Sequence, residues 1–188
     1  MTFDYQAARL TMVESQVRTS DVTDLHVQDA MRIAARETLC PPDKKPIAYA
    51  DAEIEYAPGL YLLRPRAVGK LLQALKPQPG EKTLAIAAPY AALVMRQIGC
   101  DVTEIAADKA PAKGGYTVIV AEGAVNEVPA SWTHALAEGG RLAVIVRQGP
   151  MGKVQVYVRQ NGALAWHEAF DAAAPFLPGH EPKAQFAF

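Results

Sequence analysis

The sequence predicts a doubly wound α/β fold, preceded by helices and closed by an antiparallel hairpin. Helical spacing of apolar residues dominates the chain up to residue 75. From residue 82 onward, short apolar strands alternate with helical segments, as is typical of a parallel sheet covered on both faces. Near the end, Asn161-Gly162 separates two strand-like runs and predicts a two-residue hairpin turn.

The N-terminal part contains three predicted helices. Asp4 can cap a first helix that runs through residue 17, and a second begins at the acidic cluster 21–24 and stops before Cys40-Pro41-Pro42. Residues 43–64 alternate too weakly for a strand, so we expect a long connection there. Pro65 is well placed as the first residue of a third helix, which ends near residue 76.

The remaining elements form the predicted sheet and its covering helices. The parallel strands are expected at 83–87, 102–105, 116–121 and 141–146. Helices are expected at 90–98 and 130–137, ended by Gly99 and by Gly139-Gly140. The hairpin strands are expected at 153–160 and 163–170.

Length and composition limit the classes of function. The 188 residues, 50% of them hydrophobic, suit one domain, with N-terminal helices and a loop region in 1–64 and the sheet core in 65–188. The formal net charge of -1 argues against nucleic acid or a membrane surface as partner. Two cysteines, no leader-like start and no apolar run of spanning length predict a cytoplasmic protein.

Several stretches, in order, resemble protein-L-isoaspartate O-methyltransferases. Met12-Val13-Glu14-Ser15-Gln16-Val17 is similar to the family's MVxxQ helix, Ala35-Arg36-Glu37 to its PRE/FVP segment, and Ala48-Tyr49-Ala50-Asp51 to its AYxD loop. The likeness continues through 118–124 and into the 170–178 tail. It implies a Rossmann-like S-adenosylmethionine-dependent methyltransferase fold and methyl transfer to isoaspartyl carboxylates of damaged proteins. Such a reaction depends mainly on holding the two reactants in line.

The first departure from the family lies in the cofactor loop. Where the family has a glycine-rich GxGxGY turn, this chain reads Ile86-Ala87-Ala88-Pro89-Tyr90. Methyl groups fill space, and Pro89 has no amide hydrogen to offer a ligand. Ala87, Ala88 and Tyr90 therefore mark a degenerate cofactor site, and we expect S-adenosylmethionine not to bind.

Two more departures concern the next strand. Ala106 stands where such folds place an acid for the ribose hydroxyls, with Glu104 and Asp108 beside it. The ten residues 106–115 are too few for the usual crossover helix and an extra strand, so 102–105 should be an exposed sheet edge. Glu122-Gly123, after an apolar strand, is the best candidate for a retained cofactor contact, although a simple turn explains it too.

The fourth departure removes the family's substrate hydroxyl, which precedes a proline. Leu63 occupies that position in Leu62-Leu63-Arg64-Pro65, so no catalytic residue is intact. Tyr49, Asp51, Arg64 and Pro65 are candidates for a remnant substrate cleft, and Arg64 with Arg66 can bind an acidic group. Surface arginines in a first helical turn are the alternative interpretation.

The leading hypothesis is a degenerate homologue, a pseudoenzyme with a binding or assembly role toward a protein or peptide. One alternative is an active methyltransferase whose rebuilt pocket uses Glu104 or Asp108 and Glu122. Another is a homo-oligomeric structural subunit, suggested by the shortened sheet and the apolar Phe186 and Phe188. The four scattered histidines predict no metal site.

Overall fold

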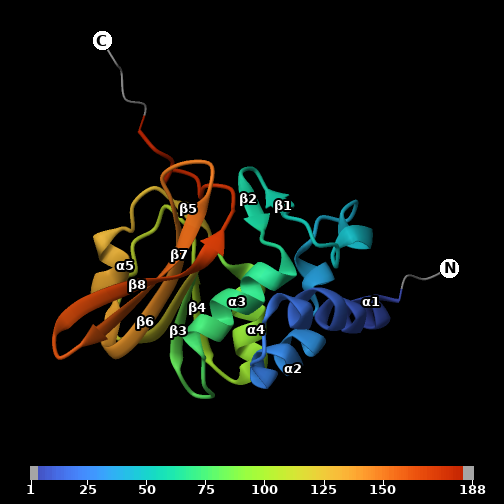
Figure 1. Cartoon of the computed structure of the whole chain (residues 1–188), viewed down its shortest axis with the longest axis horizontal. Coiled ribbons are helices and arrows are strands. Elements are labelled where there is room, and N and C mark those ends of the chain that lie inside the picture. The colour runs from blue at the N-terminus through green and yellow to red at the C-terminus, as the bar shows by residue number, and fades with distance from the viewer. Residues whose placement is uncertain (1–3, 184–188) are drawn as a thin grey trace, which may run out of the picture.

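The computed structural model describes residues 4–183, so the tail position of Phe186 and Phe188 lies outside the described residues. Figure 1 shows a twisted sheet with most of the helices gathered on one side of it. The helices are α1 (Tyr5–Met12), α2 (Leu25–Ile33), α3 (Pro65–Leu75), α4 (Pro89–Ile98) and α5 (Ala130–His134).

The three N-terminal helices are present; α3 has the predicted bounds, and the α-helical parts of the first two are shorter than predicted. Asp4 caps α1 by accepting from the Ala7 amide at 2.9 Å, and a π-helical turn (Val13–Val17) then continues α1 to the predicted end. Asp24 caps α2, which ends at Ile33 because Ala34 takes an extended backbone. That change of direction leads into a 3-10 turn (Arg36–Leu39), which places Arg36 in the core.

The connection after α2 contains two strands that the sequence analysis did not predict. Beyond a 3-10 turn (Lys45–Ile47), β1 (Ile54–Ala57) and β2 (Leu60–Leu62) pair antiparallel. Pro58 and Gly59 form their turn, and Gly59 has a φ of 71°. The expectation of a strandless connection was wrong because this Pro-Gly pair joins two strands instead of interrupting one.

The main sheet has six strands in the order β4-β3-β5-β6-β7-β8. The four parallel strands are β3 (Lys82–Ile86), β4 (Asp101–Ile105), β5 (Tyr116–Val125) and β6 (Leu136–Arg147). The antiparallel hairpin consists of β7 (Gly152–Gln160) and β8 (Ala163–Ala172), joined at Asn161-Gly162 as predicted. This is the predicted doubly wound layout with its terminal hairpin.

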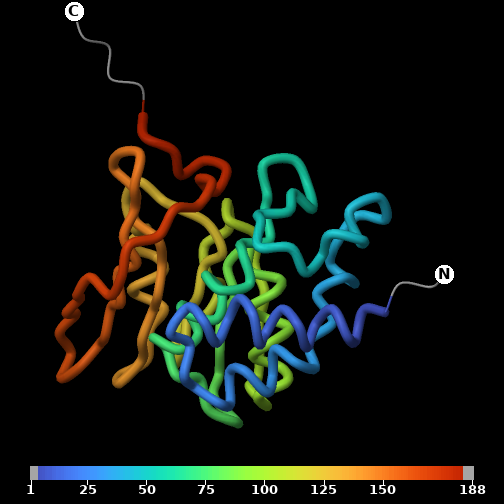
Figure 2. The backbone as a smooth tube through the Cα atoms, turned by 45° about the vertical axis from the view of Figure 1, so that its right-hand side comes forward, coloured from blue at the N-terminus to red at the C-terminus, as the bar shows by residue number. Residues whose placement is uncertain are grey.

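Each face of the sheet has its own apolar core. On one face, residues of α1 to α4 share one apolar core with Ala85, Val118 and Val120 of the sheet. Figure 2 shows the backbone of these helices in blue to green. On the other face, Trp132 of α5 and Leu177 of the C-terminal segment pack near Leu84 and Leu142. The chain therefore covers both faces, although unequally.

The last helix is shorter than predicted, whereas the edge strand lies where the sequence predicts it. The predicted helix 130–137 ends at His134, because Leu136 already pairs with Tyr116 of β5. Gly139-Gly140 lies inside β6, so its predicted role as a helix end was wrong. The predicted exposed edge is confirmed: β4 pairs only with β3, and its side chains are exposed or half-buried.

Candidate functional site

The carboxyl ends of the parallel strands meet where open α/β sheets bind ligands. Ile86 of β3 lies in register with Ile105 of β4 and with Ala121 of β5, so the three strands reach this edge together. The order of the strands reverses between β3 and β5, which makes this edge the topological switch point. The site predicted from the sequence lies here.

The turn from β3 into α4 keeps the backbone shape of a glycine turn without the glycines. Ala87 has a φ of 43°, in the left-handed region that normally favours glycine. Its amide is bound to the carbonyl of Ile105 at 2.8 Å, and Ala87 and Ala88 are both buried. The methyl group of Ala87 therefore occupies space that a glycine would leave open for a ligand.

The first turn of α4 has no free amide from Pro89 through Ala91. Pro89 has no N–H, the Ala91 amide donates to the carboxyl group of Glu122, and the Tyr90 amide lies close enough to the same group to lower its pKa. Ala92 begins the regular helical bonds by donating to the Ala88 carbonyl at 2.9 Å. The N-terminus of this helix, which in such folds attracts an anionic ligand, is capped by a side chain of the protein itself.

Glu122 reaches this helix because of an irregularity in β5. The pairing of β5 with β6 shifts between Val120 and Ala124, and Glu122 lies within that bulge. Its second carboxyl oxygen accepts from the Leu63 amide at 3.5 Å, so the side chain also joins β5 to the segment that follows β2. Burial raises the pKa of Glu122 to about 7, against the hydrogen bond from Ala91 and the charge of Arg36.

Arg36 brings a buried positive charge into the same core. Its Nε donates to the Ala48 carbonyl at 2.8 Å, and its guanidinium carbon lies 4.7 Å from the centroid of the Tyr90 ring. Burial lowers the pKa of Arg36 from its usual value, yet a guanidinium stays protonated in proteins. Arg36 and Glu122 lie near enough in the core for each charge to favour the other, and Tyr90 lies beside the arginine.

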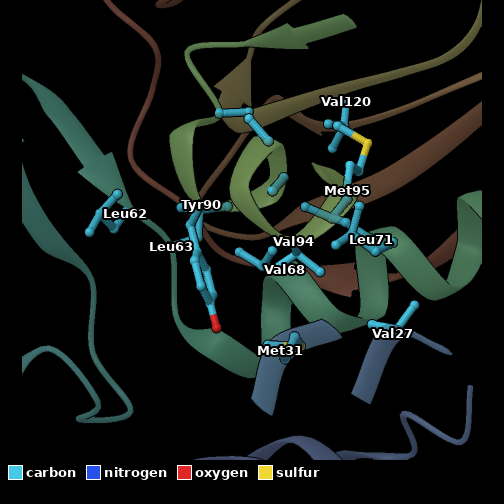
Figure 3. Packing of buried hydrophobic residues seen from close by; sticks show 14 of the residues in the cluster. Val27, Met31, Leu62, Leu63, Val68, Leu71, Tyr90, Val94, Met95 and Val120 are labelled. Atoms are coloured by element: carbon cyan, nitrogen blue, oxygen red, sulfur yellow. The ribbon is translucent and has the colours of Figure 1, made fainter. Parts of the chain in front are cut away.

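Leu63 and Leu177 pack near the bulge of β5 that contains Glu122. Leu63 is 1% exposed and lies beside Tyr90 of α4 (Figure 3). Leu177 covers Gly123, where an added Cβ would lie 2.5 Å from its Cδ2. The segment that carries Leu177 is fixed by hydrogen bonds to both the amide and the carbonyl of Ala124, each 2.8 Å long. The switch point is therefore an internal contact between three parts of the chain.

These residues do not fit the cofactor cradle that the resemblance implies. A nucleoside cofactor with an amino-acid carboxylate would need the amides that Glu122 already binds and the space that the Ala87 methyl occupies. The hydroxyl position holds the apolar Leu63. Chemically, the arrangement is a helix cap made by a buried carboxyl group, with a buried guanidinium group nearby.

The acids proposed for a rebuilt pocket lie apart from one another. Glu104 points toward α4, where it forms a 2.5 Å ion pair with Arg96, and Glu122 is buried. Asp108 lines a separate hollow of about 380 Å³ outside the ends of β4 and β5, together with Trp132 and His180. The structure therefore does not bring the three predicted acids into one pocket.

The predicted cleft residues are divided between the core and the surface. Tyr49 is buried, donates to Glu37 and accepts from Arg9 at 2.9 Å, and burial with the Glu37 bond raises the pKa of Tyr49 to about 12. Asp51 is exposed and pairs with Arg66 at 3.3 Å. The AYxD segment thus provides one structural tyrosine and one surface carboxylate.

Arg64 and Pro65 lie at the start of α3. Pro65 is the first residue of the helix and is buried, while Arg64 is half exposed and donates to Glu53 at 2.8 Å. Arg64 and Arg66 both line a hollow at this helix end that includes neither Leu63 nor Glu122. The predicted cleft and the predicted cofactor turn are therefore separate places in the molecule.

Sequence reasoning missed the role of Arg36. Its polar partners are the carbonyls of Ala48 and Leu62, which are distant in sequence, and its ring contact is Tyr90. The only available signal was its place in the Ala35-Arg36-Glu37 stretch. Within residues 4–183 no group of three or more metal-ligating side chains is close enough to hold an ion, and no helix combines the length and apolarity needed to cross a bilayer.

Comparisons with known proteins all lead to one family. The model of the family described as "Protein-L-isoaspartate(D-aspartate) O-methyltransferase" matches residues 101–178. A protein-L-isoaspartate O-methyltransferase of Rhodopseudomonas palustris is 31% identical over 172 residues, covering 76% of this chain and 70% of the relative. One from Aeropyrum pernix is 40% identical over 84 residues, which cover 45% of this chain and 32% of the relative.

Two solved structures that are also titled protein-L-isoaspartate O-methyltransferase have the same fold as this chain. A structure described as a beta-aspartate methyltransferase from Plasmodium falciparum, in complex with S-adenosyl-L-homocysteine, matches with a TM-score of 0.75 at 14% identity. The match covers 90% of this chain and 97% of that one. A second structure, titled protein-L-isoaspartate O-methyltransferase, has a TM-score of 0.72 at 17% identity. The match covers 93% of this chain and 66% of the other. The fold of this chain is thus the Rossmann-like methyltransferase fold.

Proposed function

The chain belongs to the protein-L-isoaspartate O-methyltransferase family. We propose that in this member Glu122 occupies the backbone donors that a cofactor would use, and that the protein binds a ligand without transferring a methyl group. The observation that carries this proposal is the hydrogen bond from the Ala91 amide, in the first turn of α4, to the Glu122 carboxyl group. A carboxylate is the kind of group that a helix N-terminus attracts. Glu122 thus satisfies internally the donors that an external ligand would use.

The surroundings of Glu122 support the same proposal. Its side chain is 1% exposed, and the covering Leu63 and Leu177 are 1% and 2% exposed. A cofactor could reach the α4 N-terminus by displacing Glu122, which would leave the buried Arg36 without this neighbouring carboxyl group. Displacing Glu122 would break its hydrogen bonds to the Leu63 and Ala91 amides, and leaving a buried donor without a partner costs about 1–3 kcal/mol. Such a displacement opposes binding.

Methyl transfer by this family depends on the bound sulfonium as donor, and no side chain can supply an electrophilic methyl group in its place. The protein's contribution to such a reaction is the alignment of two reactants at about 3–3.5 Å. Without a cradle this contribution is lost. The fold then remains as a scaffold for recognition, which is the role we assign to it.

An active methyltransferase is the second candidate. The hollow lined by Asp108, Trp132 and His180 favours it, because it combines an acid and an aromatic ring at the carboxyl ends of the strands. In this reading a nucleoside would lie there, away from the α4 N-terminus. Family membership supports this candidate as well.

Calorimetric titration with S-adenosylmethionine and S-adenosylhomocysteine separates the two candidates. We expect no saturable heat with this chain, and saturable binding with the Rhodopseudomonas palustris relative as the positive control. Methylation of an isoaspartyl peptide should likewise fail with this chain and succeed with the relative. Saturable nucleoside binding that is lost in Asp108→Asn but kept in the exposed control Asp101→Asn would establish the second candidate and reject the first.

A further inference from the structure

The α3–β8 hollow is a cavity of about 390 Å³ between the start of α3 and the end of β8. Arg64, Arg66 and Lys70 line it from the α3 side, and Phe170 lines it from β8. Asp21, before α2, completes the rim. The volume lies within the roughly 300–1,000 Å³ that small-molecule sites occupy.

Three cations gather around this hollow although their mutual repulsion disfavours the arrangement. Arg66 and Lys70 are four residues apart on α3, a spacing at which like charges destabilise a helix. The N-terminus of α3, which has no side-chain cap, adds the positive end of its helix dipole. Glu53 and Asp51 offset the charges of the two arginines in part, and an anion bound in the hollow would add a further counter-charge.

The cationic groups are held in place and still have donors to offer. Glu53 binds the Nε of Arg64 at 2.8 Å, and Asp51 lies 3.3 Å from the Nε of Arg66. Among residues 4–183, no hydrogen bond occupies the terminal nitrogens of these two arginines, and both side chains are 42% exposed. The carboxylates therefore orient the two guanidinium groups and leave their forked ends available.

Lys70 combines the charge with an apolar surface. Its Nζ lies 4.9 Å from the centroid of the Phe170 ring, which keeps the ammonium group at the hollow. The Phe170 ring and the alanines at 67 and 172 give the lining an apolar part. A bare inorganic ion would leave this apolar surface exposed to water, whereas an organic anion would bury it.

The acidic members of the lining do not cancel this preference. Asp171 lies directly opposite Lys153 in the β7–β8 pair, although Lys153 also forms a 2.5 Å ion pair with Glu168. The three cations of the lining outnumber its two carboxylates, Asp21 and Asp171. Asp21 is exposed at the rim and can accept a hydrogen bond from a hydroxyl or amino group of a ligand. The net preference of the hollow is for an anion with an apolar body.

We propose that the α3–β8 hollow binds a small organic anion, a carboxylate or a phosphate monoester, between Arg64, Arg66, Lys70 and Phe170. This inference gives a ligand class to the binding role proposed above and rests on that role. The hollow excludes Leu63, Glu122 and the turn at Ala87. Its ligand is therefore distinct from a nucleoside at the switch point, and the two proposals can fail separately.

The test is an NMR titration of the whole chain with four probes. Phenyl phosphate and benzoate carry both charge and ring, inorganic phosphate carries charge alone, and benzyl alcohol carries the ring alone. We expect saturable amide shifts at residues 64–70 and 170–173 with at least one of the first two probes, and weaker binding of the last two. The preferred probe of the first pair identifies the anion as phosphate or carboxylate.

Two variants and one control complete the test. Lys70→Met and Arg66→Gln should each weaken binding of the preferred probe about tenfold, because each removes a charge-assisted contact. Lys113→Met, which removes an exposed lysine from the 106–115 loop, should leave binding unchanged. The proposal is overturned if neither organic anion gives saturable shifts, if benzyl alcohol or inorganic phosphate binds as tightly, or if Lys113→Met weakens binding equally. A spectrum with native dispersion verifies that each variant is folded.

Discussion

At the scale of single residues, Glu122 decides how the switch point is organised. The same position that the sequence suggested as a cofactor contact is a buried helix cap between β5, α4 and Leu63. A carboxyl group buried in this way prefers its neutral form, and Arg36 offsets only part of that preference. The residue therefore ties the stability of the fold to pH.

Stability should fall as pH rises through the range where Glu122 ionises. Its folded pKa of about 7 exceeds the value of 4.5 for a free side chain, so its contribution is complete below pH 4.5 and is lost as pH rises toward 7. The loss is on the order of 3 kcal/mol. Urea unfolding of the wild type and of Glu122→Gln at several pH values measures it as the difference between the two curves.

The exposed Glu104→Gln variant serves as the control for this experiment, because it removes a carboxylate that is not buried. Between pH 5 and 8, the free energy of unfolding of this variant should change with pH as it does in the wild type, because the buried acid is still present. The burial argument fails if Glu122→Gln keeps the full wild-type slope in that range.

At the scale of elements, the C-terminal segment and the bulged end of β5 form one unit. Leu177 packs on Gly123, and backbone hydrogen bonds join the segment to Ala124 on both sides. Position 123 requires a glycine because Leu177 leaves no space for a Cβ atom. Backbone conformation is not the reason, because the φ of Gly123 is not in the left-handed region. This contact closes the switch point on the side opposite to α4.

The variant Gly123→Ala should destabilise the protein by about 1–3 kcal/mol through overpacking against Leu177. In the background of Leu177→Ala, the same substitution should change stability by less than about 1 kcal/mol, because the clash is removed. Chemical denaturation of the four proteins measures the coupling. Gly149→Ala, at a position with no neighbour within 4 Å, is the matched control and should be neutral.

If Gly123→Ala is equally destabilising with and without Leu177, the contact between these two residues does not explain the requirement for glycine. The effect would then originate in the β5 bulge itself, where β5 and β6 change register.

At the scale of the whole molecule, the N-terminal helices and the sheet share one core. Met31 of α2 and Val120 of β5 belong to the same apolar cluster. Trp132 lies in the other cluster, on the opposite face of the sheet. Because β5 contributes to both cores, we expect loss of packing in the helices to be felt across the sheet.

Met31→Ala should lower the free energy of unfolding by about 2–5 kcal/mol, since its side chain is fully buried. Circular dichroism and tryptophan fluorescence should show the same midpoint, shifted equally by the substitution. Leu25→Ala, at a position 66% exposed on the same helix, should change stability by less than about 0.5 kcal/mol. Two separate transitions would show that the helices and the sheet unfold independently.

Much of the fold was predictable because it depends on local signals. The caps at Asp4 and Asp24, the start of α3 at Pro65 and the turn at Asn161-Gly162 all have short-range causes. The β1–β2 hairpin and the end of α5 were not predicted. The hairpin pairs neighbouring residues across Pro58-Gly59, a turn signal that the sequence analysis interprets as a break in a strand. The end of α5 depends on the pairing of Leu136 with the distant Tyr116, which no local pattern encodes.

The sequence by itself determined the order of the elements, the family resemblance and the loss of glycine from the β3–α4 turn. Only the tertiary structure decided what Glu122 does, because its partners at Leu63, Tyr90 and Ala91 are 31 or more residues away or on another element. The same holds for Arg36 and for the α3–β8 hollow. Charge and burial act through space, so the role of a buried acid or of a cationic cluster follows from its neighbours in the fold and not from its neighbours in the chain.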